Sequence, residues 1–285
     1  METPEKPRIR HPIVMCLPEL CDGDLIVFQW FGNLMTMEWW DDLWLNEGFA
    51  SYMEYKGVAH QHPEWNPMTK IITTDLQPVM IADSSINSHP IVQHVVHPDE
   101  ITEIFDRISY AKGASVLRML EFFAGEKNFR TGITNFLKKH EYKNAQTSDL
   151  WEEISNACGY QGNRSISSIM KTWTEQMGFP YVTIKRRQNS TVFVAKQKRF
   201  LKNAAVQRER AESIHKYVWS IPLSYMTSDG KSGIVWIHEA EESKTTFVVK
   251  AALALFWGAL RHFQPWSDDE LAFPLQNSKY RVAMK

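Results

Sequence analysis

Residues 29–55 read QWFGNLMTMEWWDDLWLNEGFASYMEY. Apolar side chains in the second half of this stretch recur at intervals of three and four residues, which places them on one face of an α-helix. They are Leu45, Phe49, Tyr52 and Met53. The spacing predicts an amphipathic helix whose apolar face packs on a core. The tryptophans that precede it are interpreted as packing residues of that core, and they are Trp39, Trp40 and Trp44.

The same helical spacing continues downstream of this stretch. It is found in the segments Ile101–Ile108, Val116–Phe123, Phe129–Leu137 and Ile166–Trp173. Gly159, and Gly178 with Pro180, are typical of residues that end helices. The chain from residue 24 to about residue 179 is therefore predicted to be mostly helical.

Beyond Pro180 the apolar period changes from that of a helix to that of a strand. Apolar and polar residues alternate in four segments, with Lys244–Val249 as a weaker fifth. The four are Tyr181–Arg187, Thr191–Lys196, Trp219–Tyr225 and Ile234–His238. A turn is predicted at residues 228–230, which read SDG. The fold class expected is α+β, with a boundary near Pro180.

Composition sets broad limits on the kind of protein. The chain has 285 residues, of which 44% are hydrophobic and 23% charged, so it can bury a core and is not expected to be disordered. Its formal net charge of −1 indicates no polyanionic partner. The basic runs at 185–187 and 198–199 fit a solvated face better than a nucleic-acid site. Three cysteines form neither a disulfide framework nor a metal knuckle.

Three blocks resemble, in order and spacing, the aminopeptidase N-type (membrane alanyl aminopeptidase) zinc metallopeptidases, which are gluzincins. Residues 29–55 are similar to the block that follows the zinc motif of that family. Residues 108–120, ISYAKGASVLRML, are similar to the segment that holds its catalytic tyrosine. Residues 173–180, WTEQMGFP, are similar to the segment that closes its catalytic domain. The resemblance extends from Gln29 to about Val249.

The resemblance implies a domain plan and a parent activity. Residues 24–179 would form a partial thermolysin-like, mostly helical catalytic lobe, and residues 180–249 a small β-sandwich. Residues 1–23 are irregular and match nothing in the family, and residues 250–285 are a divergent tail that does not continue the sandwich. The implied activity is hydrolytic removal of N-terminal residues from peptides by zinc-activated water. The implied substrates are peptides with a free N-terminus.

The zinc motif of this family is H-E-x-x-H, with a further glutamate eighteen intervening residues later. Two histidines one turn apart and that last glutamate hold the metal, while the glutamate of the motif is the general base. Counting back from Glu47 puts the histidines at positions 24 and 28 and the base at 25. This chain has Asp24, Phe28 and Leu25 there. Since phenylalanine is no ligand and leucine no base, zinc is expected to be absent or weakly bound.

Three residues match functional positions of the family. Glu47 lies at the position of the third zinc ligand. Tyr110 lies where a tyrosine hydroxyl stabilises the oxyanion of the tetrahedral intermediate, an interaction worth ~3 kcal/mol in such sites. Asn46 is expected to orient a metal ligand from behind. Without the resemblance, Glu47 would be interpreted as a solvated charge and Tyr110 as a core tyrosine. The sequence does not indicate which residues bind the substrate.

His89, His94 and His97 lie close together in the sequence and include an H-x-x-H spacing. A substitute metal site is one interpretation of this spacing. The segment lies in a loop region before a predicted helix, however, and ordinary loop histidines are the favoured interpretation.

The functional prediction is a member of the zinc aminopeptidase family that is catalytically inactive as written. The alternatives are a non-catalytic peptide-binding or interaction module, which self-associates or pairs with a full-length relative, and a truncated isoform or gene fragment. Members of this family are often membrane-anchored or secretory-pathway ectoenzymes. Here the first ten residues are polar, and the longest apolar run, Ala251–Leu260, is shorter than the ~20 residues of a membrane span. Neither a signal peptide nor a span is predicted.

Overall fold

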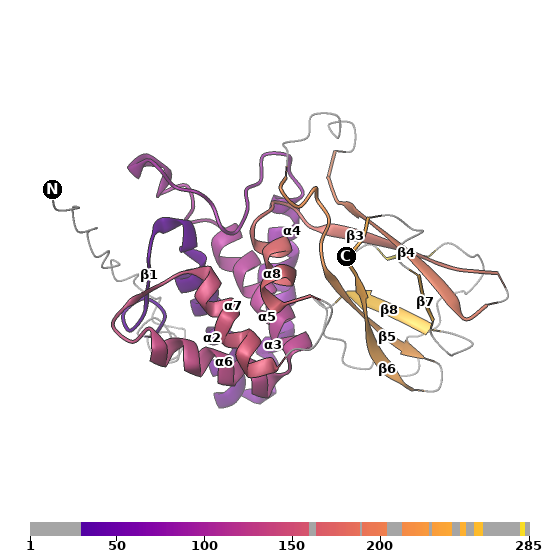
Figure 1. The fold of residues 1–285 in the computed structure, drawn as a ribbon, viewed down its shortest axis with the longest axis horizontal. Coiled ribbons are helices and arrows are strands. Elements are labelled where there is room, and N and C mark those ends of the chain that lie inside the picture. The colour runs from indigo at the N-terminus through magenta and orange to yellow at the C-terminus, as the bar shows by residue number, and fades with distance from the viewer. Residues whose placement is uncertain are drawn as a thin grey trace.

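Helices occupy the first part of the chain and strands the second. The computed structural model describes residues 30–159, 164–188, 190–203, 213–227, 230–240, 246–248, 254–258 and 280–282. Apart from two strands of two residues each, every element before residue 175 is helical, and every element from residue 180 onwards is a strand. Figure 1 shows the helices gathered on one side and the strands on the other. The predicted α+β class is confirmed at this level.

The helical part is built from α-helices joined by shorter turns. The α-helices are α2 (Trp44–Gln61), α3 (Pro67–Ile71), α4 (Gln77–Asp83), α5 (Gly113–Ala124), α6 (Glu126–Lys139), α7 (Thr147–Cys158) and α8 (Ile166–Thr174). Short 3₁₀ turns are η1 (Trp40–Asp42), η2 (Pro63–Trp65) and η4 (Pro98–Glu100), and π-helical turns are η3 (Ile72–Leu76) and η5 (Ile108–Lys112). None of these described helices has both the length and the apolarity of a membrane span.

The N-terminal half of α2 lies within the core, as its apolar spacing predicts. Phe49 is buried and stacks on Phe31 with ring centroids 4.4 Å apart. Trp44 is also buried, 5.7 Å from the ring of Trp151 on α7. The interpretation of the tryptophans as packing residues is confirmed for Trp44. Trp39 and Trp40 are only half-buried.

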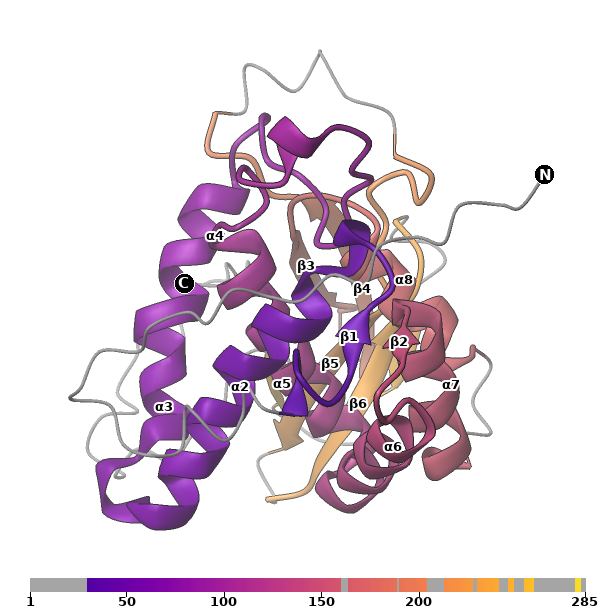
Figure 2. The same cartoon turned by 90° about the vertical axis from the view of Figure 1, so that its left-hand side faces the viewer.

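A short parallel ladder ties the segment before α2 to the connection between α6 and α7. β1 (Thr36–Met37) pairs with β2 (Asn144–Ala145), with Met37 opposite Ala145. Figure 2 shows this pair beside α6 and α7. The chain therefore enters α2 from a fixed direction, which sets the position of the first turn of that helix.

Two antiparallel sheets follow the helices. The first has the order β7-β4-β3-β9 and contains β3 (Pro180–Arg186), β4 (Val192–Arg199), β7 (Thr246–Val248) and β9 (Tyr280–Val282). The second has the order β6-β5-β8 and contains β5 (Ile221–Thr227), β6 (Ser232–Ile237) and β8 (Ala254–Gly258). The strands expected from alternation are thus present, with ends shifted by a few residues. The predicted turn at 228–230 lies largely outside the described residues.

Two expectations from the sequence are wrong. Residues 101–107 form turns rather than a helix, although Ile104 is buried against Met37 and Leu43 as its spacing requires. The tail beyond residue 250 does contribute strands, since β8 pairs with β5 and β9 pairs with β3. The expectations for residues 1–23 and for positions 24, 25 and 28 lie outside the described residues.

A buried polar cluster joins the helical part to the first sheet. The carboxylate of Asp83, at the end of α4, accepts a hydrogen bond from the backbone N–H of Gly178 at 2.8 Å and forms an ion pair with Lys112 at 2.8 Å. The Lys112 ammonium also donates to the Gly178 carbonyl at 3.0 Å. Asp83, Lys112 and Gly178, here called the junction cluster, fix the backbone just before β3 to the C-terminal end of η5.

Candidate active site

The first turn of α2 is held in place by contacts with the start of α7. The Asp42 carboxylate accepts a hydrogen bond from the Thr147 hydroxyl at 2.5 Å, and that hydroxyl accepts one from the indole N–H of Trp44 at 2.9 Å. Burial raises the pKa of Asp42, while its hydrogen bonds with Thr147 act in the opposite direction. These contacts fix the orientation in which this turn presents its polar residues.

Glu47 lies in that first turn with its side chain turned into the protein. The residue is 2% exposed, and burial raises the pKa of its carboxyl group to about 6. A hydrogen bond from the Tyr110 side chain opposes that shift. Position in the first turn of a helix also favours a negative charge. Glu47 is therefore a buried acidic group rather than the solvated charge that an isolated glutamate on such a helix would be.

Tyr110 lies on a π-helical turn. The Lys112 N–H donates to the Arg107 carbonyl at 3.0 Å, a bond that spans five residues. Asp106 begins the turn, because its carboxylate accepts hydrogen bonds from the backbone N–H groups of Ile108 at 2.9 Å and Ser109 at 3.2 Å. π-helical turns inside helical segments are frequent at functional sites, since the extra residue redirects a side chain.

The Tyr110 hydroxyl is a hydrogen-bond donor to Glu47. Burial raises the pKa of Tyr110, and the charge of Glu47 raises it further. The phenol therefore keeps its proton over the whole physiological range, as a group that donates a hydrogen bond to an anion must. The structure thus brings together two residues that lie 63 positions apart in the sequence, one from α2 and one from η5.

Asn46 lies next to Glu47 and is 1% exposed. Its side-chain nitrogen and oxygen both lack a hydrogen-bond partner among the described residues. A buried amide without partners is costly, so native proteins retain such groups where another molecule or segment meets them. Asn46, Glu47 and Tyr110 are called the half-site below.

The three histidines singled out in the sequence do not converge. His89 faces Asp106 at 3.0 Å, His94 faces Asp41 at 2.9 Å, and His97 lies at the start of η4. Within the described part of the chain, no three His, Cys, Asp or Glu side chains form a group that could hold a metal ion. His89 and His94 instead each meet a carboxylate of their own, as loop histidines commonly do.

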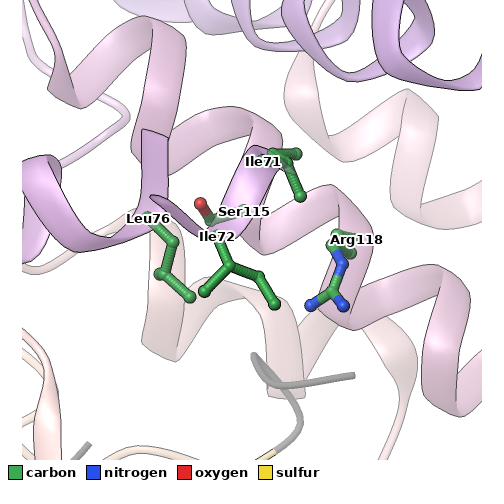
Figure 3. Close-up of a pocket in the computed structure, with 5 residues that line it drawn as sticks. All are labelled: Ile71, Ile72, Leu76, Ser115 and Arg118. Carbon is green, nitrogen blue, oxygen red and sulfur yellow. The ribbon is translucent and has the colours of Figure 1, made fainter. Parts of the chain in front are cut away.

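A small pocket lies apart from the half-site. Its lining side chains belong to α3, η3 and α5, and they are Ile71, Ile72, Leu76, Ser115 and Arg118. Figure 3 shows the three apolar side chains facing the helix that carries Ser115 and Arg118. The pocket is too narrow to admit a water molecule, and it includes none of the half-site residues. It is a packing gap rather than a ligand site.

Several residues that position the half-site were not predicted from the sequence. Asp106, which caps η5, and Lys112 with Asp83 were not singled out. An Asp two residues before a helical pattern is a general start signal and could have been recognised for Asp106. The Asp83–Lys112 pair joins segments 29 residues apart and has no local signature.

Comparison with known proteins adds an independent observation. The peptidase family M1 domain matches this chain over residues 25–173. This range begins two residues after position 23 and includes the half-site and the junction residues Asp83 and Lys112. It ends at Trp173, in α8, before the first sheet begins.

Several curated proteins are similar over a longer range. Glutamyl aminopeptidase of Bos taurus is 45% identical over 221 residues, which are 78% of this chain and 22% of that protein. Glutamyl aminopeptidase of Bitis rhinoceros is 42% identical over 230 residues, 81% of this chain and 23% of that protein. Probable aminopeptidase 1 of Saccharolobus solfataricus is 41% identical over 204 residues, 72% of this chain and 24% of that protein. The chain thus spans less than a quarter of the length of each relative.

Proposed function

Because the chain belongs to peptidase family M1, with the aminopeptidase N-type gluzincins, we propose that its half-site is the glutamate-and-tyrosine part of a zinc aminopeptidase site. The parent activity is hydrolytic removal of N-terminal residues from peptides. In this proposal Glu47 is the former third zinc ligand, Tyr110 the former oxyanion donor, and Asn46 a residue that oriented a ligand. The observation that carries it is the interaction between the Tyr110 hydroxyl and the buried Glu47 carboxylate.

The domain plan implied by the sequence is part of the same proposal. Residues 24–179 would be a partial thermolysin-like lobe and residues 180–249 a β-sandwich. Residues 1–23 would lie outside the family pattern, and the divergent tail 250–285 adds the strands β8 and β9 to the two sheets. The order of helices followed by two antiparallel sheets supports it. The buried contacts at Gly178 support a boundary close to Pro180.

The residues present do not fit a catalytic zinc ion. Peptidases of this family depend on zinc, and catalytic zinc has three protein ligands. Glu47 supplies one carboxylate, and the neighbouring Asn46 amide meets no ligand side chain among the described residues. The sequence places Asp24, Leu25 and Phe28 where the histidines and the general base would be. We therefore propose that this chain does not hydrolyse peptides by itself.

The alternative function is a non-catalytic module that binds peptides with a free N-terminus or pairs with another chain. The unsatisfied amide of Asn46 favours this alternative, because a buried donor and acceptor beside a buried carboxylate suit a polar partner. Some relatives carry the name glutamyl aminopeptidase, so peptides that begin with glutamate are the first ligands to test.

The test compares the chain with a variant in which the missing motif is rebuilt. The purified chain should contain no zinc, show no tight zinc site by calorimetry, and release no arylamine from glutamyl arylamide. The triple variant Asp24→His, Leu25→Glu, Phe28→His should bind zinc, because Glu47 would complete the ligand set. Adding Glu47→Ala to the triple variant should remove that site.

Two results would contradict the proposal. One is chelator-sensitive turnover by the unmodified chain that is lost in Tyr110→Phe. The other is a folded triple variant that binds no zinc, which would mean that positions 24–28 and Glu47 do not meet. Saturable binding of a glutamyl peptide without turnover, weakened by Asn46→Leu, would favour the alternative function.

A further inference from the structure

We propose that Gly48 and Gly113 are positioning residues, whose backbone-to-backbone contact holds the Glu47 carboxylate within reach of the Tyr110 hydroxyl. The contact lies between α2 and the start of α5. The proposal concerns how the pair is held, so it stands whether or not the chain binds zinc or a peptide.

The two helices approach more closely at these glycines than side chains would allow. A Cβ atom added at Gly48 would lie 3.1 Å from the Gly113 Cα and 3.2 Å from the Ser109 carbonyl oxygen. A Cβ atom added at Gly113 would lie 3.1 Å from the Gly48 Cα and 3.6 Å from the Trp44 ring. The first atoms met are backbone atoms, which cannot rotate away. An alanine at either position would therefore push the helices apart.

The glycines are not explained by backbone conformation. Gly113 has φ −52° and ψ −53°, which is ordinary right-handed helix open to every residue except proline. Gly48 lies inside the continuous helix α2. Glycine in a helix interior costs stability relative to alanine. What glycine provides at both positions is the close approach, because the distance between packed helices depends on the side chains at the contact.

The contact lies immediately beside the polar pair. Glu47 directly precedes Gly48, and Tyr110 precedes Gly113 by three residues, about one helical turn. The Ser109 carbonyl that meets Gly48 belongs to the residue before Tyr110. A displacement at the glycines is therefore transmitted to both side chains through a rigid backbone. Since hydrogen bonds weaken steeply with distance and angle, even a small displacement of the two backbones would weaken the interaction between these side chains.

Another glycine contact in the molecule provides a matched control. A Cβ atom at Gly132 on α6 would lie 2.8 Å from the Ile154 Cα on α7, so the approach there is at least as tight. Gly57 is a second control, because it lies on α2 itself and an added Cβ would meet nothing within 4 Å. Neither glycine adjoins the half-site in sequence.

The experiment is a double-mutant cycle of Glu47→Gln and Tyr110→Phe, measured by urea unfolding of the full chain. The cycle is repeated in four backgrounds: unmodified, Gly48→Ala, Gly57→Ala and Gly132→Ala. The coupling factor is the ratio by which the effect of Tyr110→Phe on the unfolding equilibrium constant changes when Glu47 is also replaced. We expect this factor to be roughly threefold or more in the unmodified chain. In Gly48→Ala it should fall to about one, which means no coupling, and it should persist in both controls, although Gly132→Ala lowers overall stability.

Each other outcome overturns the proposal. Coupling that is absent in the unmodified chain, or that persists in Gly48→Ala, means that the contact does not position the pair. Coupling lost equally in Gly132→Ala means that any tight helix contact has the same effect. If Gly48→Ala does not fold, Gly113→Ala repeats the test from the other helix. If neither folds, the glycines are a requirement of folding rather than positioning residues.

Discussion

The half-site and the junction cluster each include a residue of η5, Tyr110 in its middle and Lys112 at its end, yet their polar groups are satisfied to different degrees. In the junction cluster, Asp83 accepts from Gly178 at 2.8 Å and from Ser88 at 2.5 Å and pairs with Lys112 at 2.8 Å. In the half-site, the Asn46 amide meets no partner among the described residues.

This difference distinguishes two kinds of buried polar group. A network in which every group has a partner holds elements together. Removing one member leaves other buried groups without a partner, which destabilises the fold. A buried group without a partner lowers stability, and contact with another molecule or segment is one reason for a protein to keep it. By this criterion the junction cluster stabilises the fold, whereas the Asn46 amide is consistent with the role proposed for the half-site above.

The largest effect is expected from breaking the junction cluster. Lys112→Met leaves the Asp83 carboxylate, which is 2% exposed, without its counter-charge. Such a change typically costs about 3–5 kcal/mol. Urea unfolding should show a loss of that order, whereas Lys138→Met, at an exposed lysine of α6, should change little. The double variant Asp83→Leu, Lys112→Met should recover part of the loss. Equal effects of Lys112→Met and Lys138→Met would contradict this view of the cluster.

A smaller and more selective effect is expected from two buried amides. Gln197 and Asn46 are each 1% exposed, but the Gln197 side chain donates to the Trp219 carbonyl at 2.8 Å and accepts from its N–H at 2.9 Å. Gln197→Met would leave both backbone groups unsatisfied, at a cost of about 1–3 kcal/mol. Asn46→Leu breaks no such bond among the described residues, so it should leave the free energy of unfolding unchanged or raise it.

The comparison of these two variants bears on the assignment of the half-site. If Asn46→Leu costs as much as Gln197→Met in urea unfolding, then the Asn46 amide contributes to the fold. The distinction between the half-site and the rest of the buried polar groups would then be wrong. If Asn46→Leu is neutral for stability, its effect on ligand binding can be read without correction.

The sequence predicted the regular elements well and the contacts between them poorly. The apolar spacing of α2 and the alternation in β3 and β4 depend on local periodicity, which a sequence displays directly. The failure at residues 101–107 has a local cause as well. Pro98 begins the 3₁₀ turn η4, and the Asp106 carboxylate binds the N–H groups that start η5, so the helix begins only at Ile108.

The candidate site was only partly accessible from the sequence. Glu47 and Tyr110 were found through resemblance to a family, and the structure places them side by side, while their roles remain predictions. Gly48 and Gly113 gave no signal, because a glycine in a helical pattern reads as a minor loss of stability until the opposite backbone is known. Close approach is a property of two segments, and no single segment encodes it.

The smallest expected effect concerns pH and the residue that begins η5, the turn shared by both clusters. The His89 ring nitrogens face the Pro90 carbonyl at 2.7 Å and the Asp106 carboxylate at 3.0 Å. Burial lowers the pKa of His89, but the hydrogen bond and charge of Asp106 outweigh it and raise the pKa overall, with Lys112 opposing. The pKa of Asp106 is lowered overall. Burial acts against this shift, but His89 and the backbone N–H groups of Ser109 and Ile108 outweigh it.

The sign of the pH effect follows from these shifts. A histidine whose pKa is raised in the folded state stabilises the fold. This stabilisation is complete at pH values below the unfolded pKa of about 6.5 and is lost as the pH rises through the folded pKa. The lowered pKa of Asp106 acts at the acid end, where stability is lost below about 4. The free energy of unfolding should therefore decline as the pH rises above about 6.5, by less than either mutational effect above. Asp106→Asn is the matched variant, because asparagine can still accept from the backbone N–H groups of Ile108 and Ser109 but carries no charge to hold His89 protonated. Urea unfolding of Asp106→Asn should show a shallower decline over this range. Parallel pH profiles for the two proteins would mean that the His89–Asp106 contact is an ordinary surface pair that does not help to hold η5.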